Sequence, residues 1–167
     1  MDYLSLIVGN LCSILAMITD SISATRKTPK SVLMVQNLSQ LFYTIGAIAL
    51  KGYSGAVQNV VSILRNFAAI RKVESKVVEW TLVAMGVVLG IVFNNMGLVG
   101  YLPVIANLQY TLAVFRCGEN ERVLKISFMI AVGMFAVFNL FIMNYTGAVL
   151  NFTVMVTTAI ALFKKKK

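Results

Sequence analysis

The sequence predicts an all-α membrane protein with seven transmembrane helices in a 3+1+3 arrangement of two parallel triple-helix bundles. Three observations lead to this fold class. Of the 167 residues, 59% are hydrophobic and only 13% are charged, and the mean hydropathy is +0.83. Long apolar segments alternate with short basic clusters, and part of the first half of the chain recurs in the second. Because a soluble domain of this length needs a more polar surface, this composition indicates a chain that resides in a lipid bilayer.

Seven apolar segments are long enough to cross the hydrocarbon core of a bilayer, which takes about 20 residues as a helix, with about 17 tolerated. Charge clusters and turns rich in Gly, Asn or Pro separate these segments. The predicted spans are residues 4–24, 31–50, 54–71, 77–94, 97–115, 125–143 and 147–163. Because the connecting loops are short, no soluble domain fits between the spans, and any activity is expected to reside in the helices.

The distribution of Lys and Arg predicts the orientation of the chain. Thirteen of the fifteen basic residues lie in the first, third and fifth loops and in the carboxyl-terminal tail, whereas Lys51 alone lies on the opposite side. Since positive charge gathers on the cytoplasmic side of membrane proteins, we expect the amino terminus outside and the carboxyl terminus in the cytoplasm. This orientation requires an odd number of spans, in agreement with the count of seven. The first span is preceded by Asp2 and by no basic residue, so it is expected to be retained rather than cleaved as a signal peptide.

The sequence lacks the residue patterns that several classes of functional site require. The chain has no histidine, which excludes the usual His-based metal sites, catalytic triads and near-neutral proton shuttles. Cys12 and Cys117 lack the spacing of a metal site, and the expected topology places them on opposite sides of the membrane, so no disulfide is predicted. The basic residues lie between apolar runs, as in membrane loops, and predict no nucleic-acid interface. No pairing of nucleophile and base is recognisable, and neither an enzyme nor a cofactor is predicted.

Two stretches of the first half recur in the second half at nearly the same offset. Residues 53–59, YSGAVQN, match residues 145–151, YTGAVLN, at an offset of 92, and residues 8–11 match residues 99–102 at an offset of 91. These matches fall at the starts of spans three and seven and of spans one and five. Because one span intervenes, both copies cross the membrane in the same sense, as in transporters with parallel repeats. The predicted units are a first triple-helix bundle (1–76), a linker transmembrane helix (77–95) and a second triple-helix bundle with a basic tail (96–167).

This architecture resembles the SWEET and PQ-loop transporters (the MtN3-like group), and the segments GAVQNVVSILRN and TRKTPKS resemble the YgjV family of bacterial inner-membrane proteins. The resemblance covers nearly the whole chain. It implies a multi-pass protein of the bacterial inner membrane, with a central cavity between two bundles whose spans are ordered 1-3-2. It also implies that Asn59 and Asn151, on spans three and seven, hold the solute. The chain departs from the SWEET pattern, since the Pro-Gln pair is missing and only Pro103 clearly lies within a predicted helix.

Amide side chains within the spans are the main candidates for solute binding. An amide that faces lipid is costly, so most of these side chains are expected to face one another or a wet cavity. The alternative role is hydrogen bonding between helices that only fixes their packing, worth about 0.6 kcal/mol for each bond. The candidate substrate-binding residues are Asn37, Asn59, Asn66, Asn107, Asn151 and Arg65.

Asp20 and Arg65 carry charge inside the predicted spans. At 1.5 Å per residue, Asp20 lies roughly 24 Å and Arg65 roughly 16 Å below the outer surface, a difference that an arginine bridges if spans one and three touch. A lone charge there costs at least ~2.5–3.5 kcal/mol, so we expect the two residues to form a gating or charge pair. Three roles remain open: a structural salt bridge, binding of a solute carboxylate or phosphate by Arg65, and proton coupling by Asp20.

The sequence thus predicts an integral membrane transporter of a small polar solute, sugar-like or a small organic anion, that works by alternating access between two three-helix repeats. The alternative is a non-transporting membrane scaffold or partner subunit in which the amides only hold helices together. Gly86 and Gly90 form a GxxxG motif in span four. This motif is expected to pack the linker helix on its own bundle, and a homo-oligomer through the same face is the alternative. The expected partners are therefore a solute, the lipid bilayer and, on that alternative, a second copy of the chain.

Overall fold

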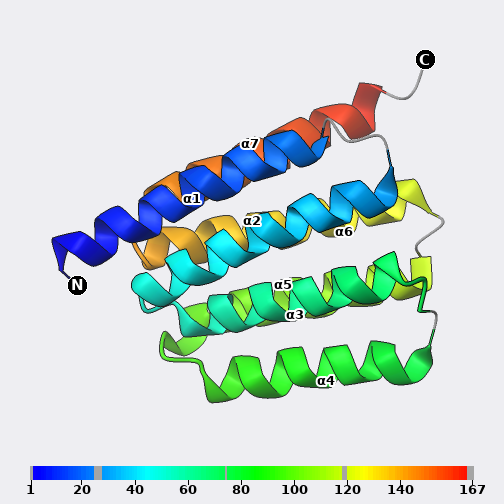
Figure 1. Ribbon diagram of the computed structural model, residues 1–167, viewed down its shortest axis with the longest axis horizontal. Coiled ribbons are helices and arrows are strands. Elements are labelled where there is room, and N and C mark those ends of the chain that lie inside the picture. The colour runs from blue at the N-terminus through cyan, green and yellow to red at the C-terminus, as the bar shows by residue number, and fades with distance from the viewer. Residues whose placement is uncertain (1, 25–27, 74, 118–119, 165–167) are drawn as a thin grey trace.

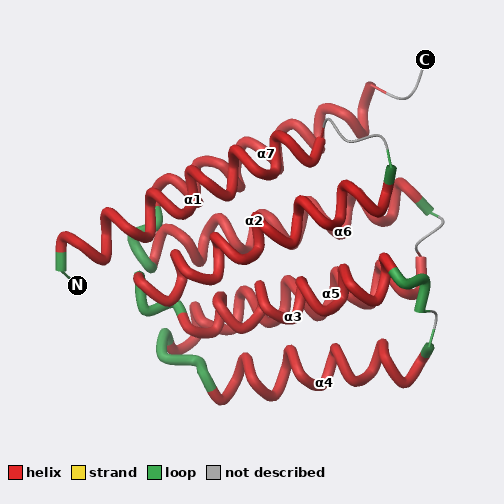
Figure 2. The backbone as a smooth tube through the Cα atoms, viewed as in Figure 1, coloured by secondary structure: helices red, strands yellow, loops and turns green. Residues whose placement is uncertain are grey.

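The structure, a computed structural model, describes residues 2–24, 28–73, 75–117 and 120–164, and these residues form only helices and loops (Figure 2). The α-helices are α1 (Tyr3–Ala24), α2 (Pro29–Ala49), α3 (Tyr53–Ile70), α4 (Lys76–Val92), α5 (Tyr101–Cys117), α6 (Glu121–Phe141) and α7 (Tyr145–Lys164). A short 3-10 helix, η1 (Gly97–Gly100), precedes α5. Each α-helix coincides with a predicted span to within a few residues, so the all-α prediction is confirmed.

Three helical segments in this part of the chain are long and apolar enough to cross a membrane: Tyr3–Ile22, Gly97–Cys117 and Arg122–Phe141. A fourth segment, Tyr145–Ile160, is apolar but shorter. Helix α4 is also apolar but has 17 residues. Helices α2 and α3 carry several amides in their interiors, which lowers their hydropathy.

The distribution of polarity is that of a protein surrounded by lipid. Large apolar side chains such as Ile7, Leu41 and Phe141 are exposed on the outside of the helices, whereas Gln58 and Asn107 are buried inside. A soluble protein of this size rarely exposes so continuous an apolar surface. In a bilayer the same pattern is favourable, because lipid tails cover the apolar faces and polar groups turn inward.

Helices α2 and α6 end in the same type of turn. In each, the residue after the C-cap has a left-handed backbone, with φ of 58° at Lys51 and 59° at Met143. The next N–H group, of Gly52 or Asn144, donates back to a carbonyl in the last turn of the helix at 2.7 and 2.8 Å. These are Schellman motifs, which satisfy the free carbonyls of a helix end. They reverse the chain within a few residues and place α3 antiparallel to α2, and α7 antiparallel to α6.

The helices form two layers with one helix at an edge (Figure 1). Helices α1, α2 and α3 pack side by side in one layer, and α5, α6 and α7 pack side by side in the other. The layers meet where α1 contacts α7 and where α3 contacts α5, whereas α2 and α6 form no extended contact. Helix α4 packs on α3 and α5 and covers that edge. The start of α1 and the end of α7 lie at opposite ends of the molecule, as an odd number of antiparallel helices requires.

The order of helices within each half differs from the 1-3-2 order that the resemblance to SWEET transporters implies. Helix α2 lies between α1 and α3, and α6 lies between α5 and α7. Short connections make consecutive antiparallel helices neighbours, which favours this order. Pro103 lies within a helix, as expected from the sequence. It is the third residue of α5, in the first turn, where a missing N–H group disrupts no helical hydrogen bond.

Gly86 and Gly90 lie on the face of α4 that packs inside the chain. Both are buried, and Gln58 Nε2 donates to the Gly86 carbonyl oxygen at 2.7 Å. A Cβ atom on Gly90 would lie 2.5 Å from Gln58 Nε2 and 2.6 Å from Val104 Cγ2. The GxxxG face therefore packs α4 against α3 and α5, as expected, and a homo-oligomer stays a prediction.

Replacing Gly90 by alanine is expected to lower the melting temperature of the purified protein in detergent, because the new methyl group overlaps Gln58 and Val104. Overpacking of this kind costs about 1–3 kcal/mol. Gly133→Ala is the matched control, since its Cβ atom would approach only Met155 Sδ, at 3.1 Å. Equal melting temperatures for the two variants would contradict the tight packing of α4.

Candidate functional site

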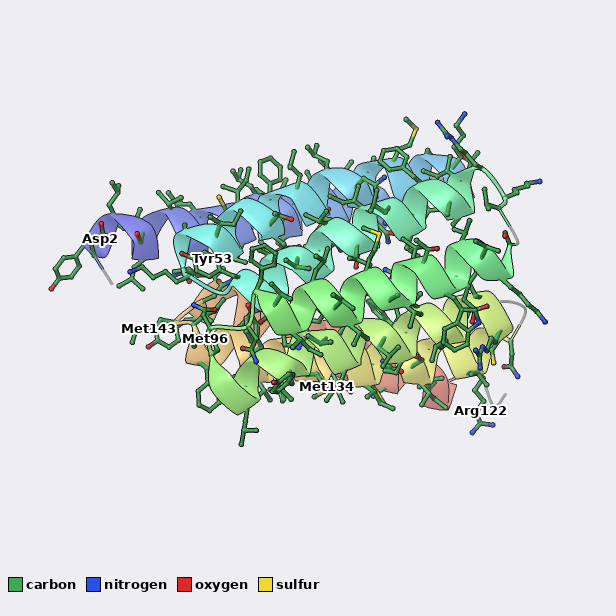
Figure 3. The ribbon with its side chains drawn as sticks, turned by 90° about the horizontal axis from the view of Figure 1, so that it is seen from below. Asp2, Tyr53, Met96, Arg122, Met134 and Met143 are labelled. Atoms are coloured by element: carbon green, nitrogen blue, oxygen red, sulfur yellow. The ribbon has the colours of Figure 1, made fainter. Side chains whose placement is uncertain are left out.

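A cavity of about 350 Å³ lies between the two layers of helices. Residues from α1, α2, α3, α5, α6 and α7 line it, and none of the described lining residues comes from α4. Ligand pockets in proteins start at about 300 Å³, so this cavity matches a small solute. In Figure 3, Tyr53, Met96 and Met143 mark one end of the molecule, and Arg122 marks the opposite end.

The structure brings five of the residues predicted from the sequence to the cavity wall: Asp20, Asn59, Arg65, Asn107 and Asn151. They come from both layers, through α1 and α3 on one side and α5 and α7 on the other. The fold thus brings together residues that are far apart in the sequence, from Asp20 to Asn151.

Asn59 and Asn151 face the cavity from opposite layers. Neither side chain forms a hydrogen bond with another residue in the described ranges, and neither has an atom among the fully buried unpaired ones. An amide left dry and unpaired costs about 1–3 kcal/mol. These two amides are therefore suited to hydrogen-bond water or a solute in the cavity. Gln40 of α2 lines the cavity as well.

Asn37 and Asn66 are placed elsewhere. Asn66 Nδ2 donates to Asn37 Oδ1 at 3.0 Å, which joins α3 to α2, and neither residue is among those that line the cavity. The hydrogen bond gives the pair a packing role, and the predicted role of these two residues in substrate binding stays a prediction. The sequence could not separate the two roles, because both put an amide on a buried helix face.

Asn66→Ala is expected to lower the free energy of unfolding by about 0.6 kcal/mol, the average for hydrogen bonds between membrane helices. Because Asn66 bonds to Asn37 outside the cavity wall, the variant is expected to leave ligand binding unchanged. Unfolding in a denaturing detergent and ligand titration measure the two effects separately. A weakened ligand affinity with unchanged stability would contradict the packing role.

Arg65 is the centre of a buried polar network. Its Nη1 atom donates to Asn107 Oδ1 at 2.8 Å and to Thr111 Oγ1 at 3.3 Å. Asn107 Nδ2 donates in turn to Gln58 Oε1 at 2.8 Å. The guanidinium carbon lies 4.8 Å from the centre of the Tyr110 ring, a cation–π contact. The network connects α3 to α5, so Arg65 belongs both to the interface between the layers and to the cavity wall.

The charge pair expected between Asp20 and Arg65 is not formed. Arg65 turns toward α5, as its bonds to Asn107 and Thr111 show, and Asp20 Oδ2 accepts a hydrogen bond from Tyr43 Oη at 3.4 Å. The expectation required contact between the first and third helices, but α2 separates them. Both charges instead line the same cavity.

Packed side chains lie at one end of the cavity, where Phe138 and Asn144 line it. Leu50, Phe138 and Ile142 form a buried apolar cluster, against which further apolar residues pack. At the same end, Asn144 Oδ1 accepts hydrogen bonds from Ser13 Oγ at 2.9 Å and from the Gly147 N–H at 3.0 Å. These contacts hold α1 to the turn between α6 and α7. This is the end that Met96 and Met143 mark in Figure 3.

Several lining residues were not among the site residues predicted from the sequence. These are chiefly aromatic and amide side chains: Tyr43, Tyr110, Phe128, Phe135, Phe138, Gln40, Asn139 and Asn144. The phenylalanines of α6 recur at helical spacing and could have been recognised as one face. In an almost entirely apolar helix, however, nothing distinguishes a cavity face from a lipid face.

Comparison with known protein families matches residues 7–167 to the family Imp-YgjV, described as a bacterial inner membrane protein. No curated protein matches the chain, and no solved structure matches it. The family match covers nearly the whole chain and so includes both layers of helices and the cavity between them.

Proposed function

Because the chain belongs to the Imp-YgjV family of bacterial inner membrane proteins, we propose that it transports a small polar solute across that membrane by alternating access. The observation that carries the proposal is the cavity between the layers. It is faced from both sides by the amides of Asn59 and Asn151, which form no hydrogen bond with another described residue. A scaffold needs no such space, and a dry interior filled by paired amides would have favoured that role. No enzymatic step is part of the proposal.

The proposal includes an internal repeat of three helices, with α1, α2 and α3 equivalent to α5, α6 and α7. The Schellman turns at Lys51 and Met143 lie 92 positions apart and support this equivalence. The equivalence pairs α3 with α7 and α1 with α5. The contact between α3 and α5 therefore corresponds to the contact between α7 and α1. Five pairs of cavity-lining residues also lie 92 positions apart: Gln40 and Val132, Tyr43 and Phe135, Ala47 and Asn139, Asn59 and Asn151, and Ser62 and Val154.

We assign all seven α-helices to the membrane, as two parallel three-helix repeats joined by α4. The end that carries Lys30, Arg71 and Arg122 then faces the cytoplasm, following the positive-inside rule, with the amino terminus outside. A solute cavity between two pseudo-equivalent halves is the feature shared with the SWEET-like plan. The helix order within each half differs from that plan.

Uptake by purified protein in sealed liposomes tests the function. Radiolabelled sugars, sugar acids and amino acids are offered one at a time, with protein-free liposomes as the control. We expect saturable uptake of at least one polar solute. Absence of uptake across all three classes would contradict the transporter and favour the scaffold.

A further inference from the structure

Asp20 and Arg65 are the two charged side chains among the described residues that line the cavity. Neither forms an ion pair within the described ranges. Asp20 is met by the Tyr43 hydroxyl, and the bonds of Arg65 go to the neutral oxygens of Asn107 and Thr111. A charge inside a membrane protein is costly and is normally paired. The cavity thus presents one negative and one positive group, each able to take an opposite charge.

Arg65 lines the cavity and keeps hydrogen-bond donors without a partner among the described residues. A guanidinium group has five N–H donors, and the bonds to other described residues use Nη1 alone. Among the described residues, the side-chain atoms that are both fully buried and unpaired do not include Nε or Nη2 of Arg65. The Tyr110 ring, 4.8 Å from the guanidinium carbon, holds the group by a cation–π contact. A planar fork with free donors suits the two oxygens of a carboxylate.

The two layers present different chemistry to the cavity. At three of the five equivalent positions, a polar residue of the first layer corresponds to an apolar residue of the second: Gln40 and Val132, Tyr43 and Phe135, and Ser62 and Val154. Ala47 and Asn139 show the reverse. Phe128 adds to the apolar wall and lies against Tyr110, with ring centroids 5.6 Å apart. Both charged residues belong to the first layer. A bound molecule is therefore expected to turn its charged groups to α1 and α3 and an apolar part to α6.

We propose that the cavity binds a small organic zwitterion with an apolar body. Its ammonium group lies at Asp20 and Tyr43, its carboxylate lies at Arg65, and its body packs on Phe128 and Phe135. The volume of about 350 Å³ corresponds to roughly ten water molecules, which limits the ligand to about the size of one amino acid. This inference rests on the proposed transport function and narrows the class of its solute.

Titration of the purified full-length protein with two sets of matched compounds tests the inference. One set is phenylalanine, phenylethylamine and phenylpropionate, and the other is aminohexanoate, hexylamine and hexanoate. The members of a set share an apolar body and differ in charge, and the two zwitterions differ in the separation of their charges. We expect at least one zwitterion to bind at least about tenfold more tightly than both of its singly charged analogues. Equal or weaker binding of both zwitterions would overturn the proposal.

Two charge-removing variants assign the subsites. Asp20→Asn is expected to weaken binding of the zwitterion and of the amine and to leave binding of the carboxylate compound unchanged. Arg65→Gln is expected to weaken binding of the zwitterion and of the carboxylate compound and to leave binding of the amine unchanged. A uniform loss for all three compounds, in variants that melt like the parent protein, would overturn the assignment. If Arg65→Gln fails to fold, Arg65→Lys replaces it and is expected to weaken the carboxylate compound selectively.

Arg116→Gln is the matched control, because Arg116 pairs with Glu79 at 2.9 Å and does not line the cavity. It is expected to leave all affinities unchanged. Uptake in liposomes separates the two proposals. If sugars are transported and neither zwitterion binds, the zwitterion proposal fails and transport stands. If a zwitterion binds as expected and no solute is transported, the proposed function fails and the binding site stands.

Discussion

Replacing Asn107 by leucine is expected to destabilise the protein by about 4 kcal/mol, the most severe effect of any single substitution considered. Asn107 Oδ1 accepts hydrogen bonds from Arg65 and from Ser62, and Asn107 Nδ2 donates to Gln58. Leucine has a similar size but leaves these three buried groups without their partner. A hydrogen bond to a charged group is worth about 1.5–3 kcal/mol, and each orphaned neutral group adds about 1 kcal/mol or more. Reversible unfolding in a denaturing detergent measures the loss.

Asn151→Leu is the control for that experiment. It makes the same chemical change at another cavity-lining asparagine, but its amide forms no hydrogen bond with the described part of the chain. The control is expected to keep the stability of the parent protein. Equal losses of stability in the two variants would contradict the network that we place around Arg65.

The double variant Asn59→Leu, Asn151→Leu is expected to reduce the efficiency of solute uptake about 10- to 100-fold without loss of stability. The two amides supply hydrogen bonds from opposite layers to whatever occupies the cavity. Each bond is worth about 0.5–1.5 kcal/mol, and 1.4 kcal/mol corresponds to a factor of ten. The initial rate of uptake into liposomes, measured over a range of solute concentrations, gives this efficiency.

The matched control for the double variant is Asn66→Ala, which also removes an amide but lies outside the cavity wall. It is expected to keep the uptake efficiency of the parent protein. Full uptake activity in the double variant would show that the two asparagines do not contact the solute, even if the protein is a transporter.

The sequence predicted the helices well because their limits are encoded locally. Basic clusters and short turns interrupt the apolar runs, so the predicted span 31–50 and the helix Pro29–Ala49 nearly coincide. Thr28 accepts a hydrogen bond from the Ser31 N–H as the N-cap of this helix, with a proline at its start, and such signals can be read from residue types alone.

The neighbours of each helix could not be predicted in the same way. Helix order depends on packing. The 1-3-2 order implied by the resemblance to SWEET transporters placed the first and third helices in contact, whereas α2 separates them. That error produced the expected pair of Asp20 and Arg65. The true partner of Arg65 is Asn107, 42 positions away on α5. No periodicity in the sequence connects these two residues.

The amides illustrate the same limit at the level of the site. Asn59 and Asn66 lie seven positions apart on one helix, and both are buried. Only the structure shows that Asn66 forms a hydrogen bond with Asn37 whereas Asn59 lines the cavity. Sequence periodicity identifies a buried face of a helix, but it does not tell whether that face meets a neighbouring helix or an open space.

Aqueous access to position 59 tests most directly whether the cavity is a path for solute. In a chain without its native cysteines, Cys12 and Cys117, which are both free thiols, Asn59→Cys supplies a single reporter. A membrane-impermeant thiol reagent is applied to sealed liposomes from outside, or enclosed within them. Alternating access predicts that the reporter reacts with reagent from either side, and that a transported solute slows both reactions. A reporter that reacts from neither side, or from one side only, would contradict the account.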